Sequence, residues 1–435
     1  MLITEGHLSK VMHHRKSREL SPSREGNNLP SPPRSSKNKA PATPPTEEAI
    51  AAENEKKKAS FIKRCITGFS LIGVYILIIY GGHLYVSLLV LMLQSMIFRE
   101  LVNVRYRANA EKNLPWFRTI QWCWFGIAML YNYGDTPQAF IRPDSDEYIY
   151  VWIRWYSRYH SWISFLLYAL VFVFSVLSLK KGYYKYQMGQ LTWTIVTLCL
   201  IVFQMRYVLN NIFQGLFWFF FPSALVVCND CFAYFCGKLW GKKFIKANFL
   251  KLSPNKTWEG FIGALFCTLV FAFFSSSFLA SISWMTCPLN TLPEFFPEPL
   301  SCNVHPVFVP TWYSIPTFVT SIFPTLTRIQ LYPIQIHAIV FAIFTSIISP
   351  FGGFYASAIK RAYKLKDFDS LLPGHGGVMD RMDCQFITAL FTSVYCSTFI
   401  WSYHTNVEAI LTSVMRLSIE EQQQILQQLQ STLSN

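Results

Sequence analysis

The stretch SAIKRAYKLKDFDSLLPGHGGVMDRMD, residues 357–383, lies between the apolar segments 334–356 and 384–403 and holds ten Lys, Arg, Asp and His side chains. The hydrocarbon core of a bilayer accepts such groups only where they face a polar cavity or the membrane surface, so the cluster indicates a functional site. Cations and a Gly-Gly turn suit phosphate groups, and carboxylates suit a divalent metal that holds phosphates. The combination predicts phosphoryl or nucleotidyl chemistry at a membrane.

The composition is that of a polytopic membrane protein. Of the 435 residues, 52% are apolar, 17% are aromatic and 14% are charged, whereas soluble domains have about 25% charged residues. The net charge of +14 does not indicate nucleic-acid binding, because the basic residues alternate with apolar spans instead of covering one soluble domain. The predicted fold is an all-α membrane bundle.

Apolar segments of near-spanning length set the predicted topology. The nine candidates are 65–82, 84–98, 117–134, 160–179, 187–205, 211–234, 258–281, 334–356 and 384–403. With a cytosolic N-terminus, the cytosolic loops hold 19 Lys and Arg and the opposite loops hold 6, as the positive-inside rule requires. This orientation brings the loops 235–257 and 357–383 to the same cytosolic face. It also predicts that the sequon Asn255-Lys256-Thr257 carries no glycan.

The two ends of the chain differ from the apolar region 61–403, which we interpret as one membrane-embedded domain. Residues 1–60 are rich in Ser, Pro, Lys and Arg, which predicts a disordered cytosolic tail. This tail is either a solvated, phosphorylatable segment or a lipid contact through Lys56-Lys57-Lys58. The C-terminal tail, 404–435, has apolar residues at helical spacing, which fits a helix on the membrane, on the protein or on a partner.

The cysteines allow two interpretations each. Cys228, Cys231 and Cys236 have the spacing of a metal motif, but they lack a His partner and lie in an aromatic helix, which favours packing. Cys287 and Cys302 lie in one hydrophilic loop on the predicted lumenal side, where they form either a disulfide or two free thiols.

Within 357–383, Asp380 and Asp383 fall on one face of a predicted helix start, where two carboxylates can share a Mg²⁺. The preceding glycines let a backbone approach a phosphate closely. The alternative is that these charges are helix-start residues and surface ion pairs. Lys364 is explained better as a topology determinant.

The second polar loop, 235–257, follows Asp230. This carboxylate lies within the predicted span 211–234 and therefore needs a metal or a Lys as partner. Downstream, Ser253 or Thr257 is a candidate N-cap for the next apolar helix. Capping does not explain why Lys256 and Glu259 adjoin the start of that helix, on the same face as the first cluster.

The strings S-x-x-K-R-x4-K-D from Ser357 and P-G-H-G-G-x-x-D-R-x-D from Pro373 resemble the signature of the CDP-diacylglycerol synthases, or phosphatidate cytidylyltransferases. The resemblance includes Asn229-Asp230, the following Gly-Lys-Leu-Trp-Gly-Lys run and residues 253–257. It covers roughly 61–403 and fits the eukaryotic, endoplasmic-reticulum branch. Asp369 departs from the pattern, since the family has a small residue there.

The resemblance implies the reaction CTP + phosphatidate → CDP-diacylglycerol + pyrophosphate, with Mg²⁺ as cofactor. It further implies a multi-pass enzyme of the endoplasmic reticulum membrane with a cytosolic active site that feeds phosphatidylinositol and related phospholipid synthesis. The expected metal ligands are Asp380 and Asp383, with Asp230 and Asp367 as weaker candidates. Phosphates would be neutralised by Lys360, Arg361, Lys366, His375 and Arg381. Substrate contacts would come from Ser253, Asn255, Lys256, Ser357, Gly376 and Gly377.

The expected partners are CTP, phosphatidate and membrane lipid, without nucleic acid, and a homodimer is the candidate assembly. One alternative function is a CTP-dependent polyprenol kinase of the dolichol-kinase type, which would release CDP instead of pyrophosphate. A second is an anion transporter, for which a polar midplane and inverted repeats are expected. The polar residues gather instead at the cytosolic ends of spans, which disfavours transport.

Overall fold

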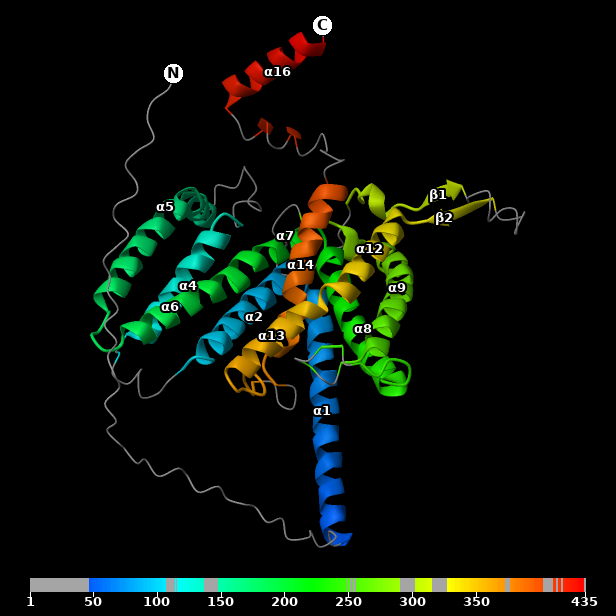
Figure 1. Cartoon of the computed structure of the whole chain (residues 1–435). Coiled ribbons are helices and arrows are strands. Elements are labelled where there is room, and N and C mark those ends of the chain that lie inside the picture. The colour runs from blue at the N-terminus through cyan, green and yellow to red at the C-terminus, as the bar shows by residue number, and fades with distance from the viewer. Residues whose placement is uncertain are drawn as a thin grey trace, which may run out of the picture. The chain divides into compact units, whose positions relative to one another are not determined.

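Helices make up nearly all of the described chain (Figure 1). The computed structural model describes residues 47–106, 114, 116–136, 148–247, 249–250, 253, 256–289, 302–314, 327–371, 376–401, 410–411, 414–415 and 418–433. Within these ranges, the strands β1 (Thr311–Ser314) and β2 (Arg328–Leu331) form one antiparallel pair, with Thr311 opposite Leu331. The predicted all-α class is confirmed, with this hairpin as an addition.

The described helices run from Glu47 to Leu433. In chain order they are α1 (Glu47–Gly81), α2 (His83–Asn103), α4 (Phe117–Tyr133), α5 (Tyr148–Leu177), α6 (Tyr184–Leu198), the π-helix η2 (Cys199–Phe203), α7 (Gln204–Phe213), α8 (Phe217–Trp240), α9 (Trp258–Ala280), α10 (Ser283–Thr286), the 3-10 helix η3 (Pro306–Phe308), α12 (Pro333–Ile347), α13 (Pro350–Ala362), α14 (Met379–Phe399) and α16 (Ile419–Leu433).

The chain divides into two compact units, residues 1–57 and 58–435. The first unit is described from Glu47 onward, where it is helical. Residues 47–60, which were predicted as the end of the disordered tail, are helical in the structure. The sequence EEAIAAENEKKKAS is rich in good helix formers, and its two leading glutamates suit a helix N-terminus. The rest of the tail lies outside the described residues.

Six helical stretches are long and apolar enough to cross a membrane. They are His83–Asn103, Val151–Leu177, Tyr184–Phe213, Phe217–Trp240, Trp258–Ala280 and Pro333–Ala362. The other three predicted spans also lie in helices: Ile66–Gly81 and α4 are shorter, and α14 begins with charged residues. Length and composition support six crossings in the part of the chain that the structure describes, and the number nine stays a prediction.

Two helix boundaries differ from the predicted ones. The expected lumenal turn at 206–210 lies inside α7, which ends at Phe213 instead. The turn follows at Gly215, where a φ of 134° favours glycine. The expected span 334–356 is two helices, because Pro350 has no N–H with which to continue α12 and stands at the first turn of α13. Hydropathy averages over such breaks, so it does not locate them.

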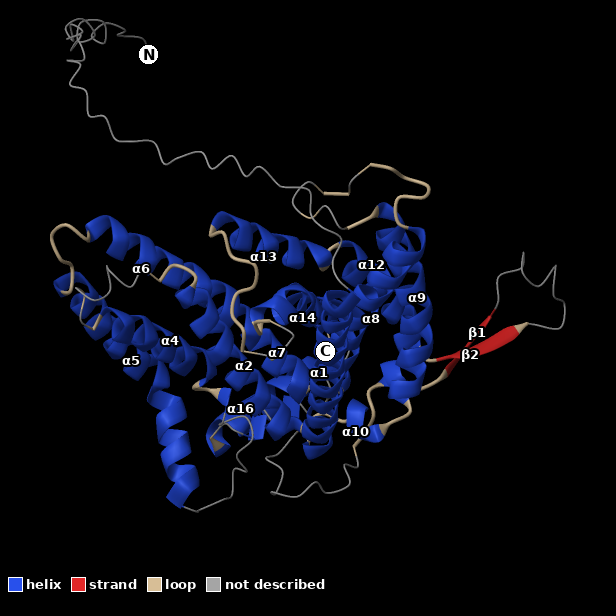
Figure 2. Ribbon diagram, turned by 90° about the horizontal axis from the view of Figure 1, so that it is seen from below, coloured by secondary structure: helices blue, strands red, loops and turns tan. Residues whose placement is uncertain are grey.

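Three groups of helices lie side by side in the larger unit. Figures 1 and 2 both place α4, α5 and α6 on one side, α8, α9 and α12 on the other, and α2, α7 and α14 between them. One apolar cluster joins the first group to the middle, and a second joins α8, α9, α12 and the end of α14. Helix α14 contributes to both, through Phe386 and Cys396.

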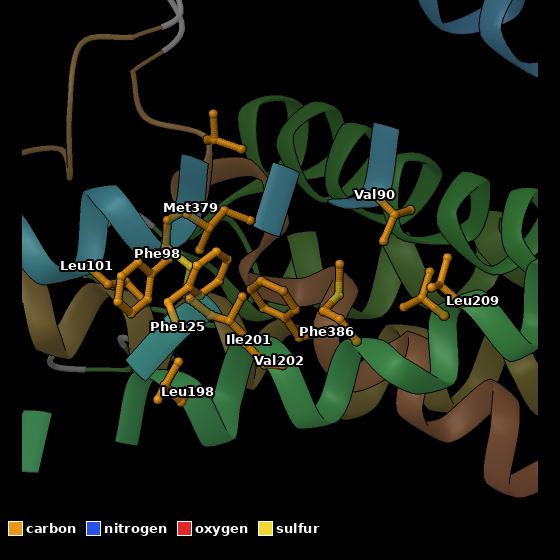
Figure 3. Packing of buried hydrophobic residues seen from close by; sticks show 14 of the residues in the cluster. Val90, Phe98, Leu101, Phe125, Leu198, Ile201, Val202, Leu209, Met379 and Phe386 are labelled. Carbon is orange, nitrogen blue, oxygen red and sulfur yellow. The ribbon is translucent and has the colours of Figure 1, made fainter. Parts of the chain in front are cut away.

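The first apolar cluster anchors the start of α14 (Figure 3). Phe98 of α2 stacks on Phe125 of α4 with ring centroids 4.4 Å apart. Met379, the first residue of α14, is only 6% exposed in the same cluster. A side chain of this size contributes roughly 1.5–3 kcal/mol when buried. Apolar packing therefore fixes the helix end that carries Asp380, Arg381 and Asp383.

Amide side chains satisfy the irregular backbone of η2 inside this core. A π-helical turn disturbs the regular ladder and leaves carbonyl groups to be paired. Asn132 of α4 donates to the carbonyl of Val202 at 2.8 Å, and Gln94 of α2 donates to the Tyr133 hydroxyl at 2.6 Å and to the carbonyl of Ile201 at 3.5 Å. These bonds tie α2 and α4 to the α6–α7 helix.

The loop after α9 is closed by a disulfide between Cys287 and Cys302. The predicted pairing of these two cysteines is confirmed. Next to it, the indole N–H of Trp284 donates to the carbonyl of Ile79 at 3.2 Å, and its ring lies against Gly82. The disulfide-bonded segment is therefore attached to the α1–α2 turn.

Candidate active site

An ion pair joins the two helices that carry the charged cluster. Lys360, in the last turn of α13, lies 2.7 Å from Asp380 Oδ1, at the start of α14, and the two side chains are 16% and 8% exposed. The other oxygen, Oδ2, accepts from the N–H of Phe368 at 3.0 Å and of Gly377 at 3.1 Å. The ammonium of Lys360 also lies 5.5 Å from the centre of the Phe368 ring.

These contacts close the segment between α13 and α14 into one unit. The attraction within a largely buried ion pair offsets the free energy of desolvation only when the other hydrogen-bonding groups of the two side chains are also paired. Here two backbone N–H groups bind the carboxylate of Asp380, and the Phe368 ring faces the ammonium of Lys360. Removing either partner of such a pair costs roughly 3–5 kcal/mol. Asp380, predicted as a metal ligand, has both oxygens engaged by the protein.

Glu100 supplies the cap of α14 from a distant part of the sequence. It stands near the end of α2 and is 1% exposed. Its two oxygens accept from the N–H groups of Val378 at 2.7 Å and Met379 at 2.8 Å. The N-cap residue itself makes no side-chain cap. A carboxylate suits this position because the first N–H groups of a helix are unpaired and carry partial positive charge.

The glycines before α14 fit tightly between these carboxylates. Gly376 has a φ of 85°, which a side chain would strain. A Cβ at Gly377 would lie 2.8 Å from Glu100 Oε2 and 3.1 Å from Asp380 Oδ2. The Gly377 N–H, expected to contact a phosphate, donates to Asp380 in this structure. The glycines therefore allow the loop to close on the two acids.

A second pair of carboxylates faces another part of the site. Asp383 precedes the apolar part of α14 and accepts from the N–H of Cys384 at 2.8 Å. A Cβ at Gly353 of α13 would lie 3.4 Å from Asp383 Oδ2, so the small residue leaves room beside this oxygen. Burial raises the pKa of Asp383 to about 6, and the charge of Asp230 on α8 adds to the rise. The negative charges of Asp230 and Asp383 thus act on one another.

Three cations act on this carboxylate pair from different elements. Asp230 is influenced by the charge of Lys256, just before α9, and by that of Arg381, on α14. The charge of Lys360 acts on Asp383. These interactions support the predicted convergence of the loops 235–257 and 357–383, and they involve groups on α8, α13 and α14 and in the segment just before α9.

Aromatic packing holds the loop 235–257 against α9 and α13. The ring of Phe249 lies 4.7 Å from Trp258 and 4.9 Å from Phe261 on α9, and 5.9 Å from Phe354 on α13. Thr257 is the N-cap of α9, where its hydroxyl accepts from the Gly260 N–H at 3.2 Å. Of the two candidate caps, Thr257 is the one that the structure uses.

The remaining predicted residues occupy different surroundings. Ser357 lies partly buried on α13, and Arg361, Lys366 and Asp367 are exposed beyond the ion pair. Asp367 lies beside Gly376, at 3.7 Å from a Cβ built there. Ser253 is partly buried and its carbonyl accepts from the Lys256 N–H at 3.1 Å. His375 and Asn255 lie outside the described residues.

The sequence interpretation missed Glu100. It was treated as part of a basic cytosolic loop, and the only local signal was an acid directly after Arg99 at the end of a span. The contact joins residues 278 positions apart, so no motif spacing reports it. Asp369, the departure from the family pattern, lies in the same acidic surroundings and acts electrostatically on Glu100.

The donor set fits a magnesium ion better than a transition metal. Among the described residues, no three His, Cys, Asp or Glu side chains are grouped to hold a metal. Mg²⁺ needs only one or two carboxylates, because it keeps waters and binds substrate phosphates. Asp230 and Asp383 are two neighbouring carboxylates whose mutual repulsion a divalent cation would relieve, and the nearby cations suit the phosphates themselves.

The fold and the site define a polytopic helical membrane protein with carboxylates and cations gathered from four helices. The sequence matches the model of the cytidylyltransferase family over residues 62–399, so the chain belongs to this family.

Curated relatives agree over most of the chain. It is 43% identical to a probable phosphatidate cytidylyltransferase of Dictyostelium discoideum, with 85% of this chain and 77% of the relative covered. It is 40% identical to a putative phosphatidate cytidylyltransferase of Schizosaccharomyces pombe, with 92% and 89% covered. It is 37% identical to phosphatidate cytidylyltransferase 1 of Homo sapiens, with 89% and 82% covered.

Proposed function

We propose that the chain transfers the cytidylyl group of CTP to phosphatidate, giving CDP-diacylglycerol and pyrophosphate. Family membership over residues 62–399 supports a cytidylyl transfer, and the named relatives support phosphatidate as the acceptor. The observation that carries the proposal is the electrostatic interaction of Asp230 with Lys256, Arg381 and Asp383, because this reaction must bring two polyanions together.

The transfer forms one bond and breaks one bond at the α-phosphorus of CTP. A phosphate oxygen of phosphatidate attacks, and the bond to the β-phosphate oxygen breaks to release pyrophosphate. The nucleophile is already an anion, so a general base is hardly needed. Catalysis then consists of positioning and charge stabilisation. Arg381 and Lys256 are placed to neutralise phosphates, and Arg361 and Lys366 stand at the exposed side for the leaving group.

Mg²⁺ is the proposed cofactor, held by Asp383 and Asp230. When bound, it supplies charge neutralisation between the two carboxylates and the phosphates. We assign Asp380 chiefly to positioning, because it holds Lys360 and the loop N–H groups in place. Lys360 in turn keeps a positive charge beside Asp383. His375 and Asn255 remain proposed phosphate and substrate contacts on the strength of the motif alone.

The proposed setting is the endoplasmic reticulum membrane, with the site open to the cytosol, where CTP is available, and to the leaflet that holds phosphatidate. The excess of Lys and Arg in the loops that carry the site supports this orientation. The product would feed phosphatidylinositol and related phospholipid synthesis. A homodimer is the proposed assembly, and cross-linking of the protein in its membrane tests it.

The decisive experiment uses CTP labelled in either the α- or the γ-phosphate, with phosphatidate and the purified chain. We expect the α-label to enter the lipid phase and the γ-label to leave as pyrophosphate. Transfer of the γ-label to a polyprenol, with release of CDP, would instead establish the kinase alternative. Failure of both labels to enter lipid, under conditions where the human relative is active, would refute the proposed reaction.

A further inference from the structure

The segment KLWGKKFIK, residues 238–246, presents basic and apolar side chains together at the end of α8. We call it the lysine loop. Its four lysines, Lys238, Lys242, Lys243 and Lys246, are all exposed. Large apolar side chains stand between them: Phe244 is 79% exposed, Leu239 is 57% exposed and Trp240 is 49% exposed. None of these residues has a role in the site described above.

The lysine loop is held in this arrangement by hydrogen bonds. The carboxylate oxygen Oε1 of Glu259, in the first turn of α9, accepts from the N–H of Phe244 at 3.1 Å and of Ile245 at 2.8 Å. The Lys243 N–H donates to the carbonyl of Trp240 at 3.0 Å. A few residues later, Phe249 packs inward on α9 and α13. The fold therefore buries one aromatic ring of this connection and keeps Phe244 pointing outward.

Its positive charge exceeds the negative charge that lies nearby. The sequence has no Asp or Glu between Asp230 and Glu259, and the carboxylate of Glu259 serves the loop backbone. The ion pairs Arg206–Asp135 and Lys360–Asp380, in the described part of the chain, do not involve the lysine loop. The four lysines thus have no carboxylate partner among the described residues.

We propose that the lysine loop docks on anionic phospholipid headgroups. These belong to the leaflet at which α8 ends and α9 begins. Both helices are long and apolar enough to cross the membrane, so a bilayer surface is already next to the loop. Trp240 is the last residue of α8 and Trp258 is the first residue of α9, and tryptophans are enriched at membrane interfaces. Lysines next to a span attract anionic lipids, and the apolar side chains between them can enter the headgroup region.

The membrane explains the loop better than an acidic protein partner. A protein partner would have to reach Leu239 and Trp240 at the end of a spanning helix, where lipid competes for the same apolar surface. If the proposed function holds, docking would also concentrate phosphatidate, an anionic lipid, beside Lys256 and Asp230. This consequence rests on the proposed function, whereas the docking itself does not.

Amide hydrogen exchange of the full-length chain in nanodiscs tests the docking without using activity. The discs contain phosphatidylcholine alone or phosphatidylcholine mixed with phosphatidylserine. We expect residues 241–247 to exchange several-fold more slowly in the anionic discs, and we expect high salt to remove the difference. Each lysine at an anionic surface contributes roughly a fivefold change in binding, so the triple variant Lys242→Gln, Lys243→Gln, Lys246→Gln should lose the lipid dependence.

Two further variants separate docking from general effects. Lys180→Gln, Lys181→Gln, Lys185→Gln removes the same charge from the α5–α6 connection and the first turn of α6, and should leave the exchange of 241–247 unchanged. Phe244→Ser keeps every charge and should weaken the protection, even if the triple lysine variant does not fold. Equal exchange of 241–247 in neutral and anionic discs would overturn the proposal. Protection of 241–247 in native membranes that neither type of disc reproduces would also overturn the proposal, because it would indicate that a protein partner binds the loop.

Discussion

At the scale of single residues, Asp380 and Asp383 differ in what already holds them. Both oxygens of Asp380 accept from Lys360 and from two backbone N–H groups, whereas Asp383 accepts from its neighbour Cys384 and faces the glycine side of α13. We expect Asp383→Asn to lower turnover on the order of 100-fold, as loss of a charge-stabilising group does, and to leave thermal unfolding in detergent unchanged. Asp380→Asn should lower both turnover and unfolding temperature, since Lys360 loses its partner.

These two outcomes test the division of roles directly. Near-normal turnover of Asp383→Asn at saturating Mg²⁺ would remove Asp383 from the metal site. An Asp380→Asn protein that unfolds at the temperature of the unmodified chain would show that the ion pair does not hold the loop.

Lys364 provides a matched control for Lys360. It follows the end of α13 with a φ of 59°, and its N–H donates to the carbonyl of Arg361 at 3.2 Å, while its side chain is exposed. Lys364→Ala should change stability by less than about 0.5 kcal/mol, as exposed substitutions do, and keep turnover. Lys360→Ala should lose most activity. An equal loss of turnover in the two variants, measured in the same assay, would contradict the assignment of Lys360 to the site and of Lys364 to the end of the helix.

The raised pKa of Asp383 has a consequence for metal binding. With a pKa of about 6, the carboxyl group is ionised at pH 8 and increasingly protonated as the pH falls through that value. A proton and Mg²⁺ compete for the same oxygens, so the Mg²⁺ concentration for half-maximal activity should rise between about pH 8 and pH 6. Titrations of activity with Mg²⁺ at several pH values measure this. A half-maximal concentration that is independent of pH would contradict it.

At the scale of elements, the contact between α2 and α14 decides where the site residues stand. Glu100 holds the first N–H groups of α14, and Met379 packs in the core next to it. Glu100→Gln keeps the size, but an amide cannot accept two N–H groups with two oxygens. We expect turnover to fall about tenfold and the Mg²⁺ requirement to rise, because α14 is less firmly placed. Glu100→Asp keeps the charge and should recover part of the turnover. A loss of stability with normal kinetic constants would make Glu100 structural only.

The sequence predicts the charged elements well and their contacts less well. The pattern around Lys360 and Asp380 locates both helices of the ion pair, and the positive-inside count brings Lys256 to the same face. Hydropathy cannot report that Pro350 divides one apolar segment into two helices, or that η2 is irregular, since both depend on individual backbone bonds. The Glu100 contact depends on the packing of α2 against α14, which no local pattern encodes.

At the scale of the whole larger unit, the two ends of the bundle have opposite character. At one end, the close of α8, the start of α9 and the start of α14 carry the site. At the other, Trp218 near the start of α8 lies 6.2 Å from Trp401 beyond α14, and Phe217 lies 4.9 Å from Phe308, not far from the disulfide. The disulfide belongs in an oxidising compartment, so the aromatic end should be lumenal and the charged end cytosolic.

This orientation predicts the chemistry available to each end in intact microsomes. Cys287 and Cys302 should react with a maleimide only after reduction and membrane permeabilisation. The sequon at Asn255 should carry no glycan, whereas a sequon added after Asn435 should be glycosylated, because α14 ends on the same side as the disulfide. Mobility shifts removed by a glycosidase measure both. A glycan at Asn255 that Asn255→Gln abolishes would invert the orientation and place the site in the lumen. Glycan-free sequons at both positions, with the C-terminus open to protease from the cytosol, would require an even number of crossings.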